Sequence, residues 1–289
     1  MTDTTDTTDT TDTTAEDLLS VRDLRVSFPG KGWRAPRTEV LKGIDLGIRP
    51  GETVGLVGES GSGKTTIGRA ILGLVPVASG TITFDGERVD TASAARRRAL
   101  SRDIQVIFQD PYTSLNPART IGDTLSEPLL AQGVDSREAR GRVAGLLERV
   151  RLPGDAAVRL PREFSGGQRQ RVAIARALAL RPRLVVCDEP VSALDLTTQA
   201  TVLELLLDIQ EETGVAYLFV SHDLSVVRFM SHRVCVIHRG EIVESGDADT
   251  LTRTPEHPYT RTLLLSAPIA DVTGQRRRRE QRAALAQAG

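Results

Sequence analysis

Cysteine, lysine and aromatic residues are scarce in this chain of 289 residues. The two cysteines, Cys187 and Cys235, are too few and too far apart for a disulfide framework or a zinc-ligand pattern. Each lies in an apolar run typical of a strand, so we interpret both as small buried hydrophobes in a reducing compartment. Lysine occurs only at positions 31, 42 and 64, so arginine carries almost all of the positive charge.

Long apolar runs are also missing. No stretch approaches the length needed to span a bilayer, and the N-terminus lacks the basic and apolar regions of a signal peptide. The net charge of −1 gives no global reason to expect nucleic acid as a partner. We therefore expect a globular protein of the cytosol, unless another protein holds it at a membrane.

The stretch 58–65 reads G-x-x-x-x-G-K-T, the pattern of a loop that wraps a phosphate chain. An apolar run precedes it and helical spacing follows, which is the order that phosphate binding requires. Glycines let backbone N–H groups turn inward, and the helix N-terminus attracts the same anion. The alternative is a glycine-rich surface turn that matches by accident. The predicted nucleotide-binding residues are Gly58, Glu59, Ser60, Gly61, Ser62, Gly63, Lys64, Thr65 and Thr66.

The pattern of apolar runs and turn residues predicts an α/β domain over residues 18–254. We expect strands at 19–28, 44–48, 53–57, 81–84, 104–108, 184–187 and 216–220, and a hairpin over 234–244. Helices are expected at 166–180, 197–213 and 224–230, and the stretch 111–161 is largely helical in pattern. These elements favour a mainly parallel sheet covered on both faces, with a helical subdomain inserted at about 110–180.

Both ends of the chain differ in amino-acid composition from this domain. Residues 1–17 repeat Thr-Thr-Asp without an apolar anchor, so we expect a disordered tail. Residues 255–270 form a C-terminal extension of loop and helix, and 271–289 form a basic tail with an arginine run at 276–279. We interpret that run as a solvated tail end; contact with anionic lipid headgroups is the weaker option.

Two further stretches carry chemistry. An apolar strand ends at Asp188 and Glu189, which places both carboxylates at the carboxyl edge of a parallel sheet, where such sheets bind ligands. Asp188 suits Mg²⁺ through its water shell, and Glu189 is a candidate general base for activating water. The second stretch, 165–168, reads Ser-Gly-Gly-Gln, in which Ser165 would cap a helix whose start can bind an anion. Two anion sites on one chain suggest that each nucleotide lies between two subunits.

The chain resembles the ATP-binding subunits of ABC transporters over about 18–268. Ser165-Gly166-Gly167-Gln168 matches the family signature, with Phe164 where many members carry leucine. Gln109 matches the Q-loop, Ser192-Ala193-Leu194-Asp195 matches the D-loop, and His222 matches the switch histidine. The resemblance implies a P-loop NTPase core with an antiparallel β subdomain and an inserted α-helical subdomain.

The resemblance also implies residue roles. ATP and Mg²⁺ would bind between two subunits facing head to tail, with Lys64 on the β- and γ-phosphates and with Thr65, Gln109 and Asp188 positioning the metal. Glu189 would polarise the attacking water, and His222, whose other interpretation is a capped or surface histidine, would sense the γ-phosphate. Across the interface, the partner's site would be completed by Ser165, Gly166, Gly167 and Gln168, and Asp195 would link the two sites. Phe28 is the expected adenine-stacking residue, with Trp33 as its competitor.

Three stretches narrow the subfamily. Residues 108–117 resemble the Q-loop segment of oligopeptide and dipeptide importers, 254–268 resemble their C-terminal motif, and 68–74 resemble the F-type of their two ATPases. Nickel and glutathione importers share these motifs. We interpret His257 and Tyr259 as packing residues of the C-terminal extension and not as catalytic ones. His232 and His238 match no motif and are interpreted as structural.

The implied partners are two membrane permease subunits, a second ATPase that is related or identical, and indirectly an extracytoplasmic binding protein. The chain would then lie at the cytoplasmic face of a bacterial membrane, without nucleic acid. The rival class is an ABC ATPase acting on DNA or ribosomes. DNA-repair members carry long coiled coils or zinc modules between their motifs, and ribosome-acting members carry two nucleotide domains in one chain, whereas this sequence has neither feature.

Overall fold

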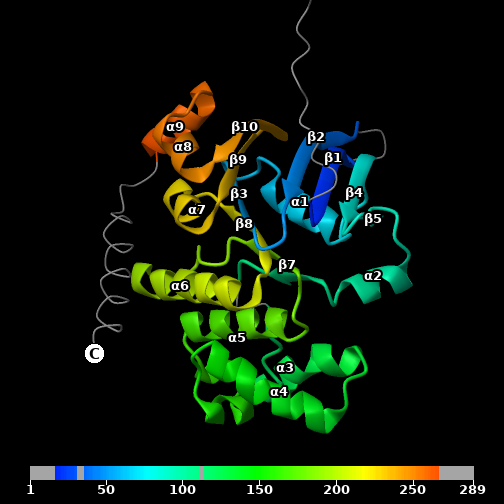
Figure 1. Ribbon diagram of the computed structural model, residues 1–289, viewed down its shortest axis with the longest axis vertical. Helices are drawn as coiled ribbons and strands as arrows, with labels where there is room; N and C mark the ends of the chain where they lie inside the picture. Colours follow the sequence, from blue (N-terminus) through cyan, green and yellow to red (C-terminus); the bar gives the residue numbers. More distant parts are fainter. Residues whose placement is uncertain (1–16, 31–35, 111–113, 267–289) are drawn as a thin grey trace, which may run out of the picture.

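The computed structural model describes residues 17–30, 36–110 and 114–266. The repetitive tail up to position 16, Trp33, residues 111–113 of the Q-loop segment, and everything after Ser266 lie outside the described residues. Figure 1 shows two groups of strands in the upper part of the view and a block of helices below them.

The central sheet has six strands in the order β10-β9-β3-β8-β7-β6. The β9, β3, β8, β7 and β6 strands run parallel, and β10 pairs with β9 as an antiparallel hairpin. This arrangement confirms the predicted mainly parallel sheet and the predicted hairpin. The strands are β3 (Thr53–Val57), β6 (Ile104–Ile107), β7 (Leu184–Asp188), β8 (Ala216–Ser221), β9 (Arg233–His238) and β10 (Glu241–Asp247).

A second, antiparallel sheet has the order β2-β1-β4-β5, with strands β1 (Leu19–Phe28), β2 (Thr38–Ile48), β4 (Ser79–Phe84) and β5 (Glu87–Arg88). β2 and β4 are longer than predicted. Gly43 and Gly80 lie inside these strands at φ +89° and +93°. The pairing of β1 with β2 changes register at Gly43, between Leu24 and Arg25, and its pairing with β4 changes register beside Gly80, between Arg22 and Arg25, so the glycines mark irregularities and not strand ends.

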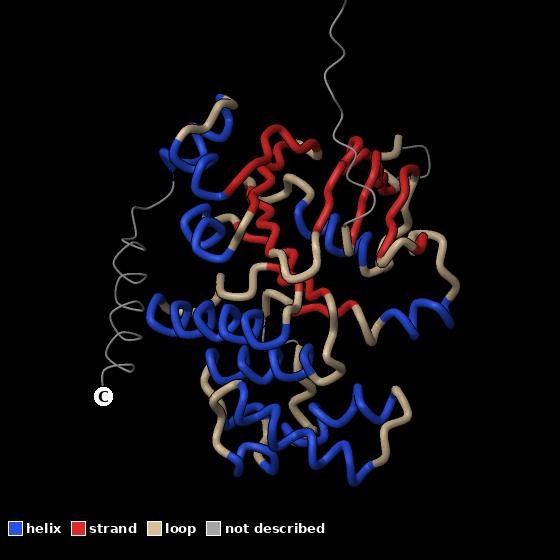
Figure 2. The backbone as a smooth tube through the Cα atoms, in the orientation of Figure 1, coloured by secondary structure: helices blue, strands red, loops and turns tan. Residues whose placement is uncertain are grey.

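Helices cover both faces of the central sheet and form the inserted block (Figure 2). The predicted helices correspond to α1, α3–α7 and α9, whereas α2, α8 and the short β5 were not predicted. The helices are α1 (Lys64–Ile71), α2 (Ala94–Leu100), α3 (Ile121–Ala131), α4 (Ser136–Arg149), α5 (Gly166–Leu178), α6 (Leu196–Thr213), α7 (Leu224–Met230), α8 (Ala248–Arg253) and α9 (Pro258–Ser266), with 3₁₀ turns at Gly154–Val158 and Pro161–Glu163.

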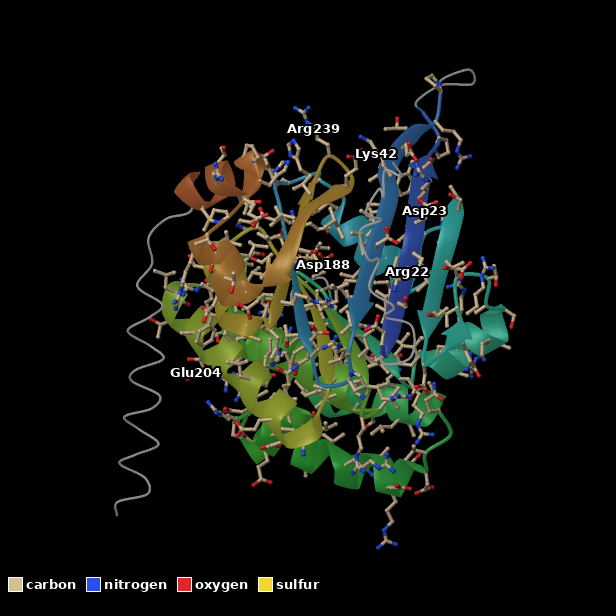
Figure 3. The ribbon with its side chains drawn as sticks, turned by 45° about the horizontal axis from the view of Figure 1, so that its top comes forward. Arg22, Asp23, Lys42, Asp188, Glu204 and Arg239 are labelled. Atoms are coloured by element: carbon tan, nitrogen blue, oxygen red, sulfur yellow. The ribbon has the colours of Figure 1, made fainter. Side chains whose placement is uncertain are left out.

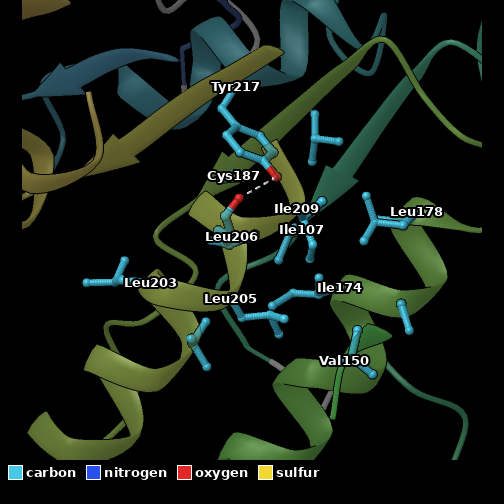
Figure 4. Packing of buried hydrophobic residues seen from close by; sticks show 14 of the residues in the cluster. Ile107, Val150, Ile174, Leu178, Cys187, Leu203, Leu205, Leu206, Ile209 and Tyr217 are labelled. Atoms are coloured by element: carbon cyan, nitrogen blue, oxygen red, sulfur yellow. Dashed lines mark hydrogen bonds between the residues drawn. The ribbon is translucent and has the colours of Figure 1, made fainter. Parts of the chain in front are cut away.

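Alternate residues of each central strand enter two different cores. In β7, Val185 and Cys187 pack with the helical side, whereas Leu184 and Val186 pack with α1 and the antiparallel sheet. Figure 4 shows the first core, in which α5, α6 and strand residues interdigitate. Burial on both faces explains why these strands read as continuous apolar runs. Burial also raises the pKa of Cys235 to about 11, so both free, buried cysteines behave as hydrophobes, as predicted.

Candidate functional site

The predicted site residues follow neighbouring strands at one edge of the central sheet. Val57 at the end of β3 pairs with Ser221 of β8, and Asp188 at the end of β7 pairs with Val220 of β8. Ile107 of β6 pairs with Cys187. The phosphate loop, Gln109, the two carboxylates and His222 therefore all leave the sheet at the same end, as the rule for open parallel sheets predicts.

The phosphate loop is fixed by close backbone approach. A Cβ on Gly58 would meet the carbonyl oxygen of Ile237 at 2.2 Å, so only glycine fits against β9 there. Gly63 precedes α1 at φ +112°, a conformation that side chains other than glycine rarely adopt. From the hairpin between β9 and β10, the Gly240 N–H donates to the Ser62 carbonyl at 3.0 Å. These protein contacts shape the loop, and the start of α1 points its unpaired N–H groups at the space that the loop encloses.

Lys64 is held inside this loop with only 4% of its surface exposed. Its ammonium group donates to the carbonyl oxygens of Gly58 at 2.7 Å and Glu59 at 2.8 Å. Burial lowers the pKa of Lys64, while the carboxylates of Glu189 and Asp188 act in the opposite direction. The positive charge is therefore poorly solvated, and an anion beside it would favour the charged form.

Thr65 and Asp188 meet across the sheet edge, where the Thr65 hydroxyl donates to Asp188 Oδ1 at 3.0 Å. Figure 3 labels Asp188 in the middle of the molecule. Burial raises the pKa of Asp188, opposed by the Thr65 hydrogen bond. Two hard oxygen donors beside a phosphate loop fit Mg²⁺, which takes few protein ligands and completes its shell with phosphate oxygens and water. The Gln109 side chain contacts Glu189, the neighbour of Asp188, and its role in positioning the metal stays a prediction.

Glu189 is the centre of a polar cluster. Its Oε2 accepts a hydrogen bond from Gln109 Nε2 at 3.1 Å and lies 3.3 Å from His222 Nδ1. The three residues come from the ends of β6, β7 and β8, so the fold brings together the three predicted catalytic residues. Glu189 also has φ +49°, a strained conformation for a residue with a side chain, and its N–H donates to the Val220 carbonyl at 3.0 Å.

The predicted signature begins α5, as expected. The Ser165 hydroxyl accepts from the Gln168 N–H at 3.3 Å, and the Gln168 side chain accepts from the Ser165 N–H at 2.9 Å, which forms a capping box. A Cβ on Gly167 would meet Thr198 Cγ2 at 2.1 Å. Thr198 in turn donates both its N–H and its hydroxyl to the Asp195 carboxylate, so the signature and the D-loop stretch are packed together.

The remaining predicted residues have simpler surroundings. Phe28 is partly buried against the core beneath the antiparallel sheet, and its role on adenine stays a prediction. His232 is structural, because its Nδ1 accepts from the Thr53 N–H at 3.0 Å. Tyr259 does pack as predicted, with its ring 3.9 Å from that of His238, but its hydroxyl also contacts the phosphate loop. No local pattern in the sequence indicates this contact, because Glu59 and Tyr259 are 200 positions apart.

Known families match two parts of the chain. The ABC transporter family matches residues 41–192, and the family described as oligopeptide/dipeptide transporter, C-terminal region, matches residues 243–289. Among curated proteins, the glutathione import ATP-binding protein GsiA of Escherichia coli (strain K12) is 50% identical over 269 residues. The protein of that name from Salmonella choleraesuis (strain SC-B67) is equally similar. Each alignment covers 91% of this chain and 43% of the relative, so the chain spans less than half the length of these relatives.

Solved structures share the fold. The cbiO1 structure from Clostridium perfringens, described as part of the ABC transporter complex cbiONQ, superposes with a TM-score of 0.73 at 28% identity. That match covers 82% of this chain and 91% of the other. A second match is the dimeric, post-hydrolysis structure of the ATP-binding cassette MJ0796, bound to ADP and Pi, which superposes with a TM-score of 0.71 at 30% identity. That match covers 80% of this chain and 98% of the other. These neighbours confirm the predicted fold class.

Proposed function

Because the chain belongs to the ABC transporter family, we propose that it is the ATP-hydrolysing subunit of an importer of short peptides. The observation that carries the proposal is the Glu189 cluster, held by Gln109 and His222 beside the Thr65–Asp188 pair. The family match at residues 243–289 supports a peptide-type importer. The GsiA relatives make glutathione, itself a short peptide, the specific substrate to test alongside dipeptides.

In the proposed mechanism, the loop amides and Lys64 bind the phosphates of ATP, and Thr65 and Asp188 hold Mg²⁺, which supplies positive charge at the reacting phosphate when bound. Glu189 orients the attacking water and accepts its proton. Gln109 and His222 keep that carboxylate in place from two other strands. The signature helix end at Ser165 serves the site of a second ATPase subunit, so hydrolysis requires a dimer.

Coupling to transport would occur through two permease subunits in the membrane. Among the described residues, no helix combines the length and apolarity of a membrane span. We propose that the chain binds peripherally to the cytoplasmic side of these permeases, through the inserted helical block and the stretch after Gln109. The second ATPase is a related chain or a second copy of this one.

Pull-down from detergent-solubilised membranes tests the import proposal. The tagged chain is expected to recover two integral membrane proteins, and vesicles containing this complex are expected to accumulate dipeptide or glutathione only when ATP is supplied. The same vesicles are also tested with nickel ion, because nickel importers share these motifs; accumulation of nickel in place of peptide would assign the chain to a nickel importer. Recovery with ribosomes or DNA, and without a permease, would contradict the importer and favour the rival class of ABC ATPase.

Lys64→Ala is expected to weaken ATP binding by about 10- to 150-fold, the range for a hydrogen bond to a charged group. The affinity is measured by calorimetric titration of ATP into the purified full chain with Mg²⁺. Lys42→Ala is the matched control, because Lys42 is a partly exposed lysine paired with Glu241 at 3.8 Å, and it should bind ATP normally. If Lys64→Ala bound ATP as tightly as the wild type does, the proposal that this loop binds the phosphates of ATP would be wrong.

A further inference from the structure

The motif His257-Pro258-Tyr259 at the start of α9 has no role in the mechanism above, yet it reaches the nucleotide site. The hydroxyl oxygen of Tyr259 accepts a hydrogen bond from the backbone N–H of Glu59 at 3.0 Å. Glu59 is the second residue of the phosphate loop, 200 positions away in the chain. Figure 1 shows α9 at the β10 edge of the central sheet, where β9 separates β10 from β3, the strand that leads into that loop.

The peptide group that Tyr259 contacts is the one that holds Lys64. Its N–H belongs to Glu59, and its carbonyl oxygen belongs to Gly58, which accepts from the Lys64 ammonium at 2.7 Å. The N–H and C=O of one planar peptide point in opposite directions, so Tyr259 and Lys64 hydrogen-bond the Gly58–Glu59 peptide group from opposite sides. Hydrogen bonds that share a peptide group also polarise one another.

Tyr259 itself is firmly placed. Its ring lies 3.9 Å from that of His238 at an interplanar angle of 36°, and α9 packs on the helical core through Leu263 and Leu264. The segment before α9 is anchored by Glu244, whose carboxylate accepts the N–H groups of Glu256 at 2.8 Å and His257 at 3.1 Å. The hydroxyl is therefore held in position before any ligand arrives.

We propose that Tyr259 is a positioning residue for the phosphate loop, through which the C-terminal segment 255–266 sets the affinity for ATP. The inference rests on the proposed function of the loop. By fixing the Gly58–Glu59 peptide, the tyrosine preorganises both the loop backbone and Lys64, which removes an ordering cost from nucleotide binding. Because the loop holds the phosphates before and during reaction, the contribution is uniform binding, which changes KM and leaves kcat unaltered.

Tyr259→Phe tests this proposal, since it removes only the hydroxyl and keeps the ring on His238. We expect the Kd for ATP and the KM to rise about 2- to 10-fold, the net worth of one hydrogen bond. The kcat at saturating ATP should stay within about twofold of wild type. Calorimetric titration gives the Kd, and steady-state phosphate release by the full chain gives KM and kcat.

Tyr217→Phe is the matched control. The Tyr217 hydroxyl also bonds to backbone, donating to the Leu206 carbonyl at 3.1 Å, but inside the core and away from the loop (Figure 4). This variant should melt roughly 2–4 °C lower and bind ATP as the wild type does. Unchanged ATP affinity in Tyr259→Phe, or an equal loss in Tyr217→Phe, overturns the inference. A wild-type chain that does not bind ATP overturns the proposed function instead.

Discussion

Glu189→Gln is expected to lower ATP turnover by about 10²–10⁴-fold, the usual contribution of a general base. Glutamine has nearly the shape of glutamate, so its side-chain oxygen can still accept from Gln109 Nε2, which lies 3.1 Å from Glu189 Oε2. It cannot accept the proton of the attacking water. ATP binding should persist, because the phosphate loop is untouched, and the ATP-bound dimer should accumulate since it cannot be resolved by hydrolysis.

Three measurements on the purified chain check this prediction: phosphate release, calorimetric ATP affinity, and gel filtration with and without ATP. Glu52→Gln is the control, because Glu52 is matched in exposure, at 14% against 15% for Glu189, and is paired with Arg233 at 3.2 Å. The control should hydrolyse ATP at the wild-type rate. Unchanged steady-state hydrolysis in Glu189→Gln would remove Glu189 as the base.

Much of this site was predictable because it depends on strand ends. Apolar runs locate β3, β7 and β8, and the carboxyl ends of parallel strands meet at one edge, so Thr65 and Asp188 were expected to be neighbours. Helix capping by Ser165 could also be predicted from the sequence, because the cap involves only residues within one helical turn. Local chemistry and sheet geometry together account for the correct predictions.

Other features depend on tertiary contacts that no local pattern encodes. Nothing in the sequence indicates that Glu189 has φ +49°, because that strain is maintained by contacts with β8. The bond from Glu59 to Tyr259 joins positions 200 apart. The hydrogen bond from Gln109 to Glu189 likewise depends on the relative placement of β6 and β7. The full lengths of β2 and β4 also depend on their pairing with β1, which the local sequence pattern does not show.

Ser165→Arg is expected to abolish turnover, by at least about 10²-fold, while ATP affinity stays within about twofold of wild type. In the proposed dimer, the start of α5 faces the γ-phosphate bound by the partner subunit. An arginine there removes the serine hydroxyl and fills the space beside the partner's γ-phosphate, so the one site that it faces cannot be completed. The loop that binds ATP lies on β3 and α1 and keeps its own contacts, including those of Lys64. Phosphate release and calorimetric titration measure the two quantities separately.

A matched substitution separates this effect from loss of a helix cap. Ser93 caps α2 as Ser165 caps α5, with its hydroxyl accepting from the Arg96 N–H at the same distance of 3.3 Å. Both substitutions should cost about 1 kcal/mol of stability, but Ser93→Arg should retain turnover because α2 has no part in the proposed interface. Wild-type turnover in Ser165→Arg contradicts a role for the signature.

The same variant tells whether the signature acts on a second subunit. If the chain pairs with itself, mixing Ser165→Arg chains with Lys64→Ala chains produces dimers that contain one intact site, made of Lys64 from one chain and Ser165 from the other. Turnover should then reappear in the mixture although each variant alone is inactive. If Ser165→Arg instead loses ATP affinity as severely as Lys64→Ala does, the signature belongs to the chain's own site. Each chain would then hold a complete site, against the division between two subunits that we propose.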